Sequence, residues 1–257
     1  MTETAMTEQI ALITGGSRGL GRSIALHLAA EGVGVAITYL SREDEAAAVV
    51  AEAQALGVGA VALQLDTGDT TAFDDFVARF STALDETWGR SDFDHLVNNA
   101  GIGIHSPFLE TTEEQFDQLL NIHLKGVFFL TQRLVPLMVD GGRIVNMSTG
   151  LARFSMPGYS VYGAAKGAVE VLTRYLAAEL GGRDISVNAV APGAIETDFG
   201  GGVVRDVQAL NDQIASITAM GRVGLPDDVG GAVASLLTGG NQWITAQRIE
   251  ISGGMNL

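Results

Sequence analysis

Short apolar runs alternate with longer helical patterns along the chain, and this alternation restricts the fold more than any other feature of the sequence. The strands are expected at 10–13, 33–38, 58–65, 93–97, 143–147, 185–190 and 248–252. The helices between them are expected at 22–30, 43–56, 71–88, 112–138, 159–180 and 226–237. Strands that are apolar almost throughout are buried on both faces, as in a parallel sheet covered by helices. The sequence therefore predicts one doubly wound α/β domain over 9–257, after a flexible N-terminus at 1–8.

Charge and composition exclude several classes of function. The 257 residues include 15 basic and 30 acidic side chains, which gives a formal charge of −15. A polyanion would meet a negative surface here, so a nucleic-acid partner is not expected. The absence of cysteine excludes disulfides and thiolate chemistry, and no metal-ligand spacing occurs. The acidic N-terminus does not resemble a signal peptide, and glycines break the uncharged stretch at 229–247, so we expect a cytoplasmic protein without a membrane span.

Three glycines lie in the first strand-to-helix turn, at Gly15, Gly19 and Gly21. A tight turn there lets a pyrophosphate approach main-chain amides at the positive end of a helix. The spacing is G-x-x-x-G-x-G, which differs from the usual dinucleotide fingerprint. The same stretch matches the hydrolase motif G-x-S-x-G around Ser17. The chain's four histidines, however, all lie in its first half, where such hydrolases do not place their base.

A second group of residues can move a proton. Tyr162 and Lys166 are four positions apart and share one helix face. A neighbouring ammonium favours the phenolate and lowers the pKa of a tyrosine, so the pair could exchange a proton with a carbonyl oxygen. Ser148 and Thr149 end the fifth strand, and strand alternation lets only one of them face Tyr162. Asn121 is a polar residue in the middle of a predicted helix.

Together these residues resemble the short-chain dehydrogenase/reductase family. The matching motifs are Thr14 to Gly21, Asp66, Asn98-Asn-Ala-Gly101, Asn121, Tyr162-Gly-Ala-Ala-Lys166 and Asn188 to Gly193. They run in the family's order and spacing from residue 9 to 254. The closing Gln247 to Gly254 is similar to the 3-oxoacyl-carrier-protein reductase-like branch. The resemblance implies a seven-stranded sheet of order 3-2-1-4-5-6-7 and hydride transfer with a nicotinamide cofactor.

The resemblance also implies roles for single residues. Tyr162 would donate the proton, and Lys166 would hold the nicotinamide ribose and lower the pKa of Tyr162. Asn121 would position a water in a proton relay. The family's catalytic serine stands 13 positions before the tyrosine, and that position is Thr149 here, with Ser148 one residue early. We therefore expect the Thr149 hydroxyl to take this role.

The resemblance implies a set of cofactor contacts that starts in the glycine turn and ends after the sixth strand. They are Gly15, Ser17, Arg18, Gly19, Leu20, Gly21, Ser41, Arg42, Asp66, Thr67, Asn98, Ala100, Gly101, Tyr162, Lys166, Pro192, Gly193, Ile195 and Thr197. An acid at the end of strand two would select NAD, but Tyr39 stands there. Arg18 and Arg42 could instead pair with the 2′-phosphate of NADP, so NADP(H) is the expected cofactor and NAD(H) the alternative.

These observations predict an NADPH-dependent reductase of a ketone or 3-oxoacyl substrate. The alternatives are an NAD-dependent alcohol or sugar dehydrogenase and a catalytically impaired nucleotide-binding regulator. Gly200 to Gly202 predict a lid at about 194–217, although an ordinary surface loop would show the same pattern. By analogy with the family, helices 112–138 and 159–180 would form a homo-oligomer, a dimer or a tetramer.

Overall fold

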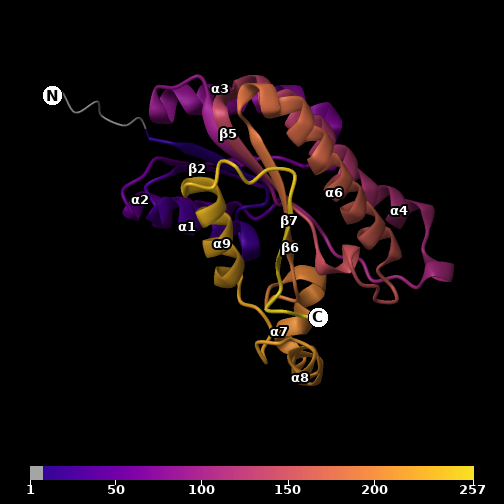
Figure 1. Ribbon diagram of the computed structural model, residues 1–257. Helices are drawn as coiled ribbons and strands as arrows, with labels where there is room; N and C mark the ends of the chain where they lie inside the picture. The colour runs from indigo at the N-terminus through magenta and orange to yellow at the C-terminus, as the bar shows by residue number, and fades with distance from the viewer. Residues whose placement is uncertain (1–7) are drawn as a thin grey trace.

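Seven parallel strands form a single sheet at the centre of the molecule, in the order β3-β2-β1-β4-β5-β6-β7 (Figure 1). The computed structural model describes residues 8–257, so nearly all of the predicted flexible segment 1–8 lies outside the described residues. The strands are β1 (Ile10–Ile13), β2 (Gly34–Tyr39), β3 (Ala60–Gln64), β4 (Phe93–Asn98), β5 (Met138–Met147), β6 (Ser186–Pro192) and β7 (Arg248–Ile251). The predicted fold class and strand order are confirmed.

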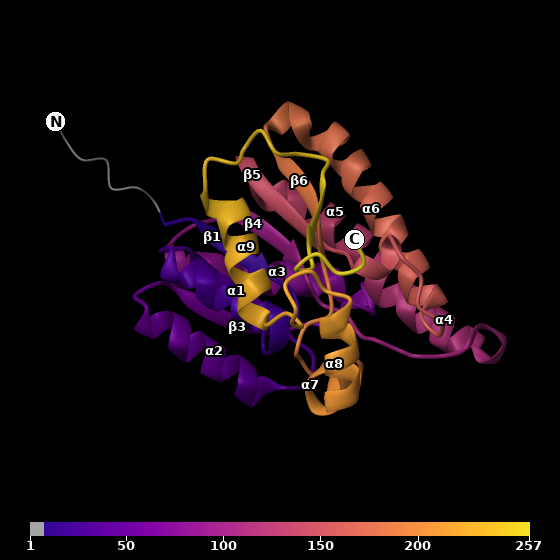
Figure 2. The ribbon, with the colours of Figure 1, turned by 60° about the horizontal axis from the view of Figure 1, so that its bottom comes forward.

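Helices cover both faces of the sheet (Figure 1). One face carries α1 (Gly19–Ala30), α2 (Glu43–Ala55) and α9 (Pro226–Thr238). The other carries α3 (Phe73–Trp88), α4 (Glu113–Leu120), α5 (Val127–Leu134) and α6 (Ser160–Leu180). The short helices α7 (Val203–Asp206) and α8 (Gln208–Ser216) lie apart from these two layers, near the C-terminus (Figure 2). Short 3₁₀ turns are η1 (Thr70–Ala72), η2 (Phe108–Glu110), η4 (Val135–Leu137), η5 (Gly150–Ala152), η6 (Gly181–Arg183) and η7 (Phe199–Gly202).

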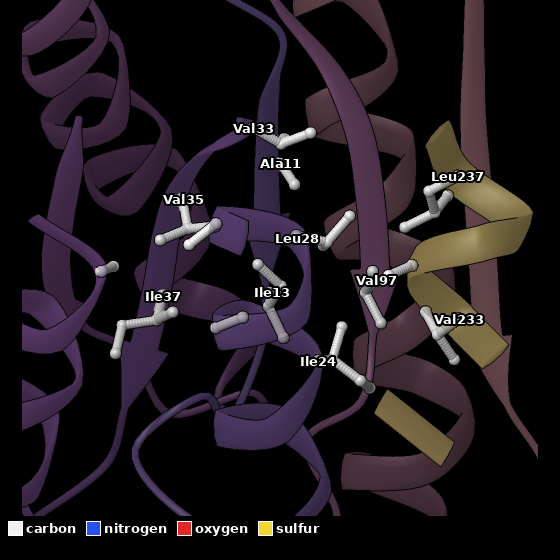
Figure 3. Close-up of a cluster of buried hydrophobic side chains, with 14 of the residues drawn as sticks. Ala11, Ile13, Ile24, Leu28, Val33, Val35, Ile37, Val97, Val233 and Leu237 are labelled. Carbon is white, nitrogen blue, oxygen red and sulfur yellow. The ribbon is translucent and has the colours of Figure 1, made fainter. Parts of the chain in front are cut away.

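The core holds the strand ends in fixed positions. On the first face, Ile13 and Ile37 of the sheet pack with Ile24 of α1, and α9 adds Val233 and Leu237 (Figure 3). On the second face, the phenylalanines of α3 pack against β4. Each fully buried side chain of this size contributes about 1.5–3 kcal/mol. A sheet clamped on both sides presents the carboxyl ends of its strands at one edge, where open α/β sheets bind their ligands.

The expected helix 112–138 is interrupted, and this is the main difference from the sequence prediction. A π-helical turn, η3 (Asn121–Gly126), separates α4 from α5. A side chain at Gly126 would collide with the carbonyl oxygen of Thr67, so the wide turn brings the helix backbone close to the β3–α3 loop. π-Helical turns often occur at functional sites.

Strand β5 begins at Met138, five residues before the expected start at 143. Gly141 and Gly142 lie within it and hide the apolar pattern of a strand. Glycine is required at 142 because a side chain there would approach the carbonyl oxygen of Asp94 to 2.7 Å. Within residues 8–257, none of the helices combines the length and apolar character that a membrane crossing needs.

Candidate active site

The start of α6 brings Tyr162 and Lys166 together beside the end of β5. Both side chains are buried, with 7% and 3% of their surface exposed. Lys166 Nζ donates a hydrogen bond to the main-chain oxygen of Met147 at 2.6 Å and lies 6.0 Å from the centre of the Tyr162 ring. The predicted pairing on one helix face is therefore present, and β5 holds the ammonium in place.

Burial sets the protonation of this pair. It raises the pKa of Tyr162 to about 12, against a lowering contribution from the neighbouring Thr149 hydroxyl. Burial also lowers the pKa of Lys166 to about 8. The sequence predicted that the ammonium would lower the pKa of Tyr162, but the neighbour that does so here is Thr149. A protonated phenol at neutral pH is a proton donor.

The two hydroxyls at the end of β5 have different partners. Ser148 Oγ donates to Glu170 Oε1 at 2.6 Å, away from the phenol. Thr149 begins the turn η5, where its Oγ1 accepts the Leu151 amide at 3.2 Å. The hydroxyl hydrogen of Thr149 is left to donate toward Tyr162 or a substrate. The geometry thus favours Thr149 for the role that the sequence left open between these two residues.

His123 is a residue that the sequence analysis passed over. It lies in η3, two positions after the half-buried Asn121, and its ring meets Tyr162 edge-on at 5.1 Å. Its Nε2 bonds to the carbonyl of Ile102 at 2.8 Å, and its buried Nδ1 has no partner among the described residues. Burial and the Lys166 ammonium lower the pKa of His123 to about 3, although the Ile102 bond opposes this. His123 is therefore neutral at neutral pH, and its ring packs against the Tyr162 phenol.

The glycine turn forms a cradle that side chains would fill. A β-carbon at Gly15 would come within 2.9 Å of Ala100 Cα, and one at Gly21 would overlap the carbonyl of Gly15. Gly19 has φ +54°, and a β-carbon there would meet only Thr197, at an ordinary contact distance of 3.6 Å. Asn99 closes the turn by donating to the carbonyls of Thr14 at 2.8 Å and Gly15 at 3.1 Å. The cradle at the N-terminus of α1 therefore fits a dinucleotide pyrophosphate.

Comparison with known proteins assigns the chain to a family. Residues 15–256 match the family model described as Enoyl-(Acyl carrier protein) reductase. A 3-oxoacyl-[acyl-carrier-protein] reductase FabG of Staphylococcus aureus (strain Mu50 / ATCC 700699) is 37% identical, over 95% of this chain and 97% of that protein. This chain belongs to the short-chain dehydrogenase/reductase family.

Two solved structures of ketoreductases are similar along nearly the whole length. The promiscuous reductase LugOII, which catalyses keto-reduction at C1 during lugdunomycin biosynthesis, is 37% identical with a TM-score of 0.93, over 99% of this chain and 100% of that one. The angucycline C-6 ketoreductase LanV with bound NADP is 35% identical with a TM-score of 0.91, over 96% and 95%. The cofactor-bound neighbour has the same overall fold as this short-chain dehydrogenase/reductase.

The residues predicted to line the adenosine side of the cofactor lie in two kinds of place, some beside the cradle and one with its side chain in the core. Asp66 follows β3 and is exposed, with one carboxylate oxygen accepting the Gly68 amide at 2.8 Å. Ala100 and Gly101 lie beside the cradle and against His123. Asn98, in contrast, turns its side chain into the core, where it donates to Thr131 and Asn146. Its predicted cofactor contact therefore depends on its main chain alone.

The residues predicted to choose between NAD and NADP are Tyr39, at the end of β2, and two arginines that precede helices. Arg42 precedes α2 beside Ser41 and pairs with Glu45 at 3.4 Å. Arg18 precedes α1 and pairs at 3.2 Å with Asp198, which comes from the opposite side of the sheet edge. Both arginines are exposed, and Asp198 is a partner that sequence reasoning did not identify.

The other side of the site is the predicted lid, 194–217, which follows β6. Gly193 packs on Ser252, Ile195 pairs with Gly224 in an isolated bridge, and Thr197 faces Gly19. Phe199 then places its ring 5.6 Å from Tyr162 and over Gly103, where a β-carbon would approach it to 2.7 Å. The cavity beside Tyr162 has a volume of only about 10 Å³, which is too small for a substrate. Across residues 8–257, no group of three histidine or acidic side chains could hold a metal ion.

Proposed function

We propose that this short-chain dehydrogenase/reductase is an NADP(H)-dependent carbonyl reductase. The observation that carries the proposal is a buried, protonated Tyr162 that neighbours the Thr149 hydroxyl and the Lys166 ammonium. The names of the similar structures support it, since LugOII and LanV reduce ketones and LanV holds NADP.

The residues of the site divide the work of carbonyl reduction. Bound NADPH would supply the hydride that adds to the carbonyl carbon. Tyr162 donates its hydroxyl proton to the carbonyl oxygen, and Thr149 donates a hydrogen bond to the same oxygen. The Lys166 ammonium stabilises the tyrosinate left behind and would hold the nicotinamide ribose. Pro192, Gly193, Ile195 and Thr197 would line the nicotinamide side.

A phenol whose pKa burial raises to about 12 holds its proton at neutral pH, as the proton donor in carbonyl reduction must, and the same group accepts a proton in the reverse reaction. The similarity to two ketoreductases is the reason to place reduction ahead of the alternative alcohol or sugar dehydrogenase.

Arg18 and Arg42 support the choice of NADP(H). They precede α1 and α2, and Tyr39 ends β2 at the position where an NAD-dependent relative would carry a carboxylate. Steady-state kcat/KM with NADPH and with NADH, in wild type and in Arg18→Ala and Arg42→Ala, tests the assignment. We expect each substitution to reduce kcat/KM for NADPH and to leave kcat/KM for NADH unchanged. A wild-type preference for NADH would refute the assignment of NADP(H) as the cofactor.

We propose a cyclic or aromatic ketone as the substrate. His105 and Tyr159 pack edge-on at 5.3 Å, Tyr159 lies 6.5 Å from Tyr162, and Phe199 completes an aromatic wall. Aromatic side chains in edge-on and tilted arrangements present flat apolar surface on which a ring can pack. A carrier-protein substrate would need a basic patch at the entrance, and a net charge of −15 makes this less favourable.

Loss of NADPH absorbance with a panel of substrates tests the reaction itself. The panel should contain polycyclic ketones, simple alkyl ketones and 3-oxoacyl thioesters, and the corresponding alcohols with NADP⁺. We expect the polycyclic ketones to give the highest kcat/KM. If NADPH bound but no compound turned over, the chain would instead be the nucleotide-binding regulator considered above.

We also propose a homo-oligomer in the cytoplasm. Large apolar side chains are exposed on α4 and α5 (Phe116, Phe128 and Phe129) and on α6 (Val171 and Tyr175). Exposed apolar surface of this kind is typical of subunit contacts. Light scattering of the purified protein would identify a dimer or tetramer, and a monomer at micromolar concentration would contradict the proposal.

A further inference from the structure

A group of charged residues connects the end of β5 to α6 and β7. Glu170 lies on α6, one turn beyond Lys166, and its Oε1 accepts two hydrogen bonds. Ser148 Oγ donates at 2.6 Å and Arg248 Nε at 2.7 Å. The side chains of Glu170 and Arg248 are 14% and 23% exposed, so both charges lie largely out of water. Such a pair stabilises only a well-defined geometry, because removing either partner leaves a buried charge unpaired.

Arg248 reaches the active site from β7. Its Nη2 donates to the main-chain oxygen of Thr149 at 3.2 Å, and its Nη1 donates to Glu250 at 2.9 Å. Burial alone would lower the pKa of Arg248, but the bonds to Glu250 and Glu170 raise it, so the guanidinium stays charged. The planar Arg248 guanidinium thus connects α6, β7 and the turn that begins at Thr149.

The position of Thr149 matters for the reaction proposed above. Its hydroxyl and that of Tyr162 must both lie within hydrogen-bond distance of one carbonyl oxygen. A misplacement of about 1 Å in such a site can reduce the rate about 100-fold. The Thr149 hydroxyl itself accepts only a local bond, from Leu151, so the long-range restraint on this residue comes through its carbonyl.

We propose that Arg248, held by Glu170, is a positioning residue that places the Thr149 hydroxyl relative to Tyr162. The inference depends on the proposed function, since it assigns Arg248 a part in carbonyl reduction through Thr149. Neither Arg248 nor Glu170 contacts the cradle, so their effect should be on turnover and not on cofactor affinity.

The chain offers a matched control in Arg153. This arginine binds the same Glu250 through two bonds of 2.8 Å, but its other donors reach the main-chain oxygens of Met255 and Asn256. Arg153→Gln therefore removes a comparable ion pair from the same network without touching Thr149.

The test compares Arg248→Gln with Arg153→Gln, each in the wild-type and Thr149→Ala backgrounds, using kcat and KM for NADPH and for a reducible ketone. In the wild-type background we expect Arg248→Gln to lower kcat about tenfold or more and to leave the KM for NADPH within about twofold. Arg153→Gln should change kcat less than about twofold. In the Thr149→Ala background the effect of Arg248→Gln should disappear, because there is no hydroxyl left to place.

The split between kcat and KM is a readout that a merely structural role would not give. Displacement of the Thr149 hydroxyl in Arg248→Gln should lower kcat and leave the KM for NADPH within about twofold, whereas a general loss of structure would change both. If Arg248→Gln does not fold, Glu170→Gln replaces it, since the amide keeps an oxygen acceptor for Ser148.

Two results would overturn the inference. One is an equal loss of kcat in Arg248→Gln and Arg153→Gln, and the other is a loss that persists undiminished in the Thr149→Ala background. Failure of the proposed function is distinguishable, because it would appear as an inactive wild type or as a Thr149→Ala variant with full activity.

Discussion

The two sides of the site are built in different ways. The cradle side consists of the carboxyl ends of β1, β4 and β5 with the start of α6, and its key side chains are buried and bound to main chain. The proposed lid, 194–217, contains three successive glycines with positive φ and meets the other side through the exposed pair Arg18–Asp198 and the packing of Phe199 near Tyr162. Exposed ion pairs contribute little to stability, whereas buried and hydrogen-bonded groups fix one geometry. We infer that one side is set for chemistry and the other is free to admit substrate.

The largest expected effect comes from the cradle side. Tyr162→Phe removes the proton donor while keeping the ring that packs on His123. General acid catalysis contributes about 10²- to 10⁴-fold, so kcat should fall by that factor. The Kd for NADPH, measured by fluorescence titration, should change less than about twofold. Undiminished turnover would show that the fixed side does not carry the chemistry.

A pair of glycine substitutions contrasts the two sides directly. Gly21→Ala would force a β-carbon into the carbonyl of Gly15, whereas Gly200 of the lid has nothing within 4 Å of the same position. We expect Gly21→Ala to weaken NADPH binding by about tenfold or more, as a misplaced site would. Gly200→Ala carries only the strain of its positive φ, about 1 kcal/mol. Calorimetric titration of both variants with NADPH measures the two affinities. Equal affinities would contradict the proposed contrast between the cradle side and the segment 194–217.

Acid should weaken the fold through two buried histidines, neither of which lies in the segment 194–217. Burial lowers the pKa of His95 and of His123 to about 3, below the unfolded value near 6.5, and the lid contains no histidine. The unfolded chain therefore binds more protons, so stability is full above pH of about 6.5 and falls by about 1.4 kcal/mol per unit and per histidine as the pH drops toward 3. Urea unfolding at pH 7 and pH 5 measures this slope. His95→Leu should reduce the change in the free energy of unfolding between pH 7 and pH 5. The control is His105→Leu, which removes an exposed histidine and should leave that change as it is in the wild type.

The smallest effect is expected where the two sides meet. Asp198 places a negative charge next to Arg18, at the site proposed for the 2′-phosphate. Asp198→Asn should therefore lower the KM for NADPH by about two- to fivefold, with less change as salt increases. NADH should be unaffected, and Asp206→Asn, which removes a partner of Arg205 alone, is the control. An equal change in the KM for NADPH and for NADH would show that the Arg18–Asp198 pair does not affect binding of the 2′-phosphate.

The sequence located the glycine turn and the Tyr162–Lys166 pair for a physical reason. Glycines are needed where backbone meets backbone, and a tyrosine and lysine four apart must share a helix face. Spacing alone therefore located Gly15, Gly21, Tyr162 and Lys166. The periodicity of apolar residues also predicted the strands and their parallel sheet, whereas their order was implied by the resemblance to the family.

Features that depend on distant partners were not predictable in this way. The inward turn of Asn98 depends on Asn146 and Thr131, and the role of Ser148 depends on Glu170. The packing of Phe199 on Tyr162 requires two segments 37 positions apart to meet. No local sequence pattern predicts such contacts. Glu170, one turn beyond Lys166 on the same helix face, is the one signal that could have suggested a partner for Ser148.

The bond between Arg248 and the carbonyl of Thr149 spans 99 positions of the chain. A nascent chain that has extended only as far as α9 already contains every side chain proposed to touch cofactor or substrate, yet it lacks the strand that restrains Thr149. The restraint on Thr149 therefore cannot form until β7, the last strand of the chain, has joined the sheet beside β6. The complete catalytic geometry should accordingly be the last feature of the site to form during synthesis.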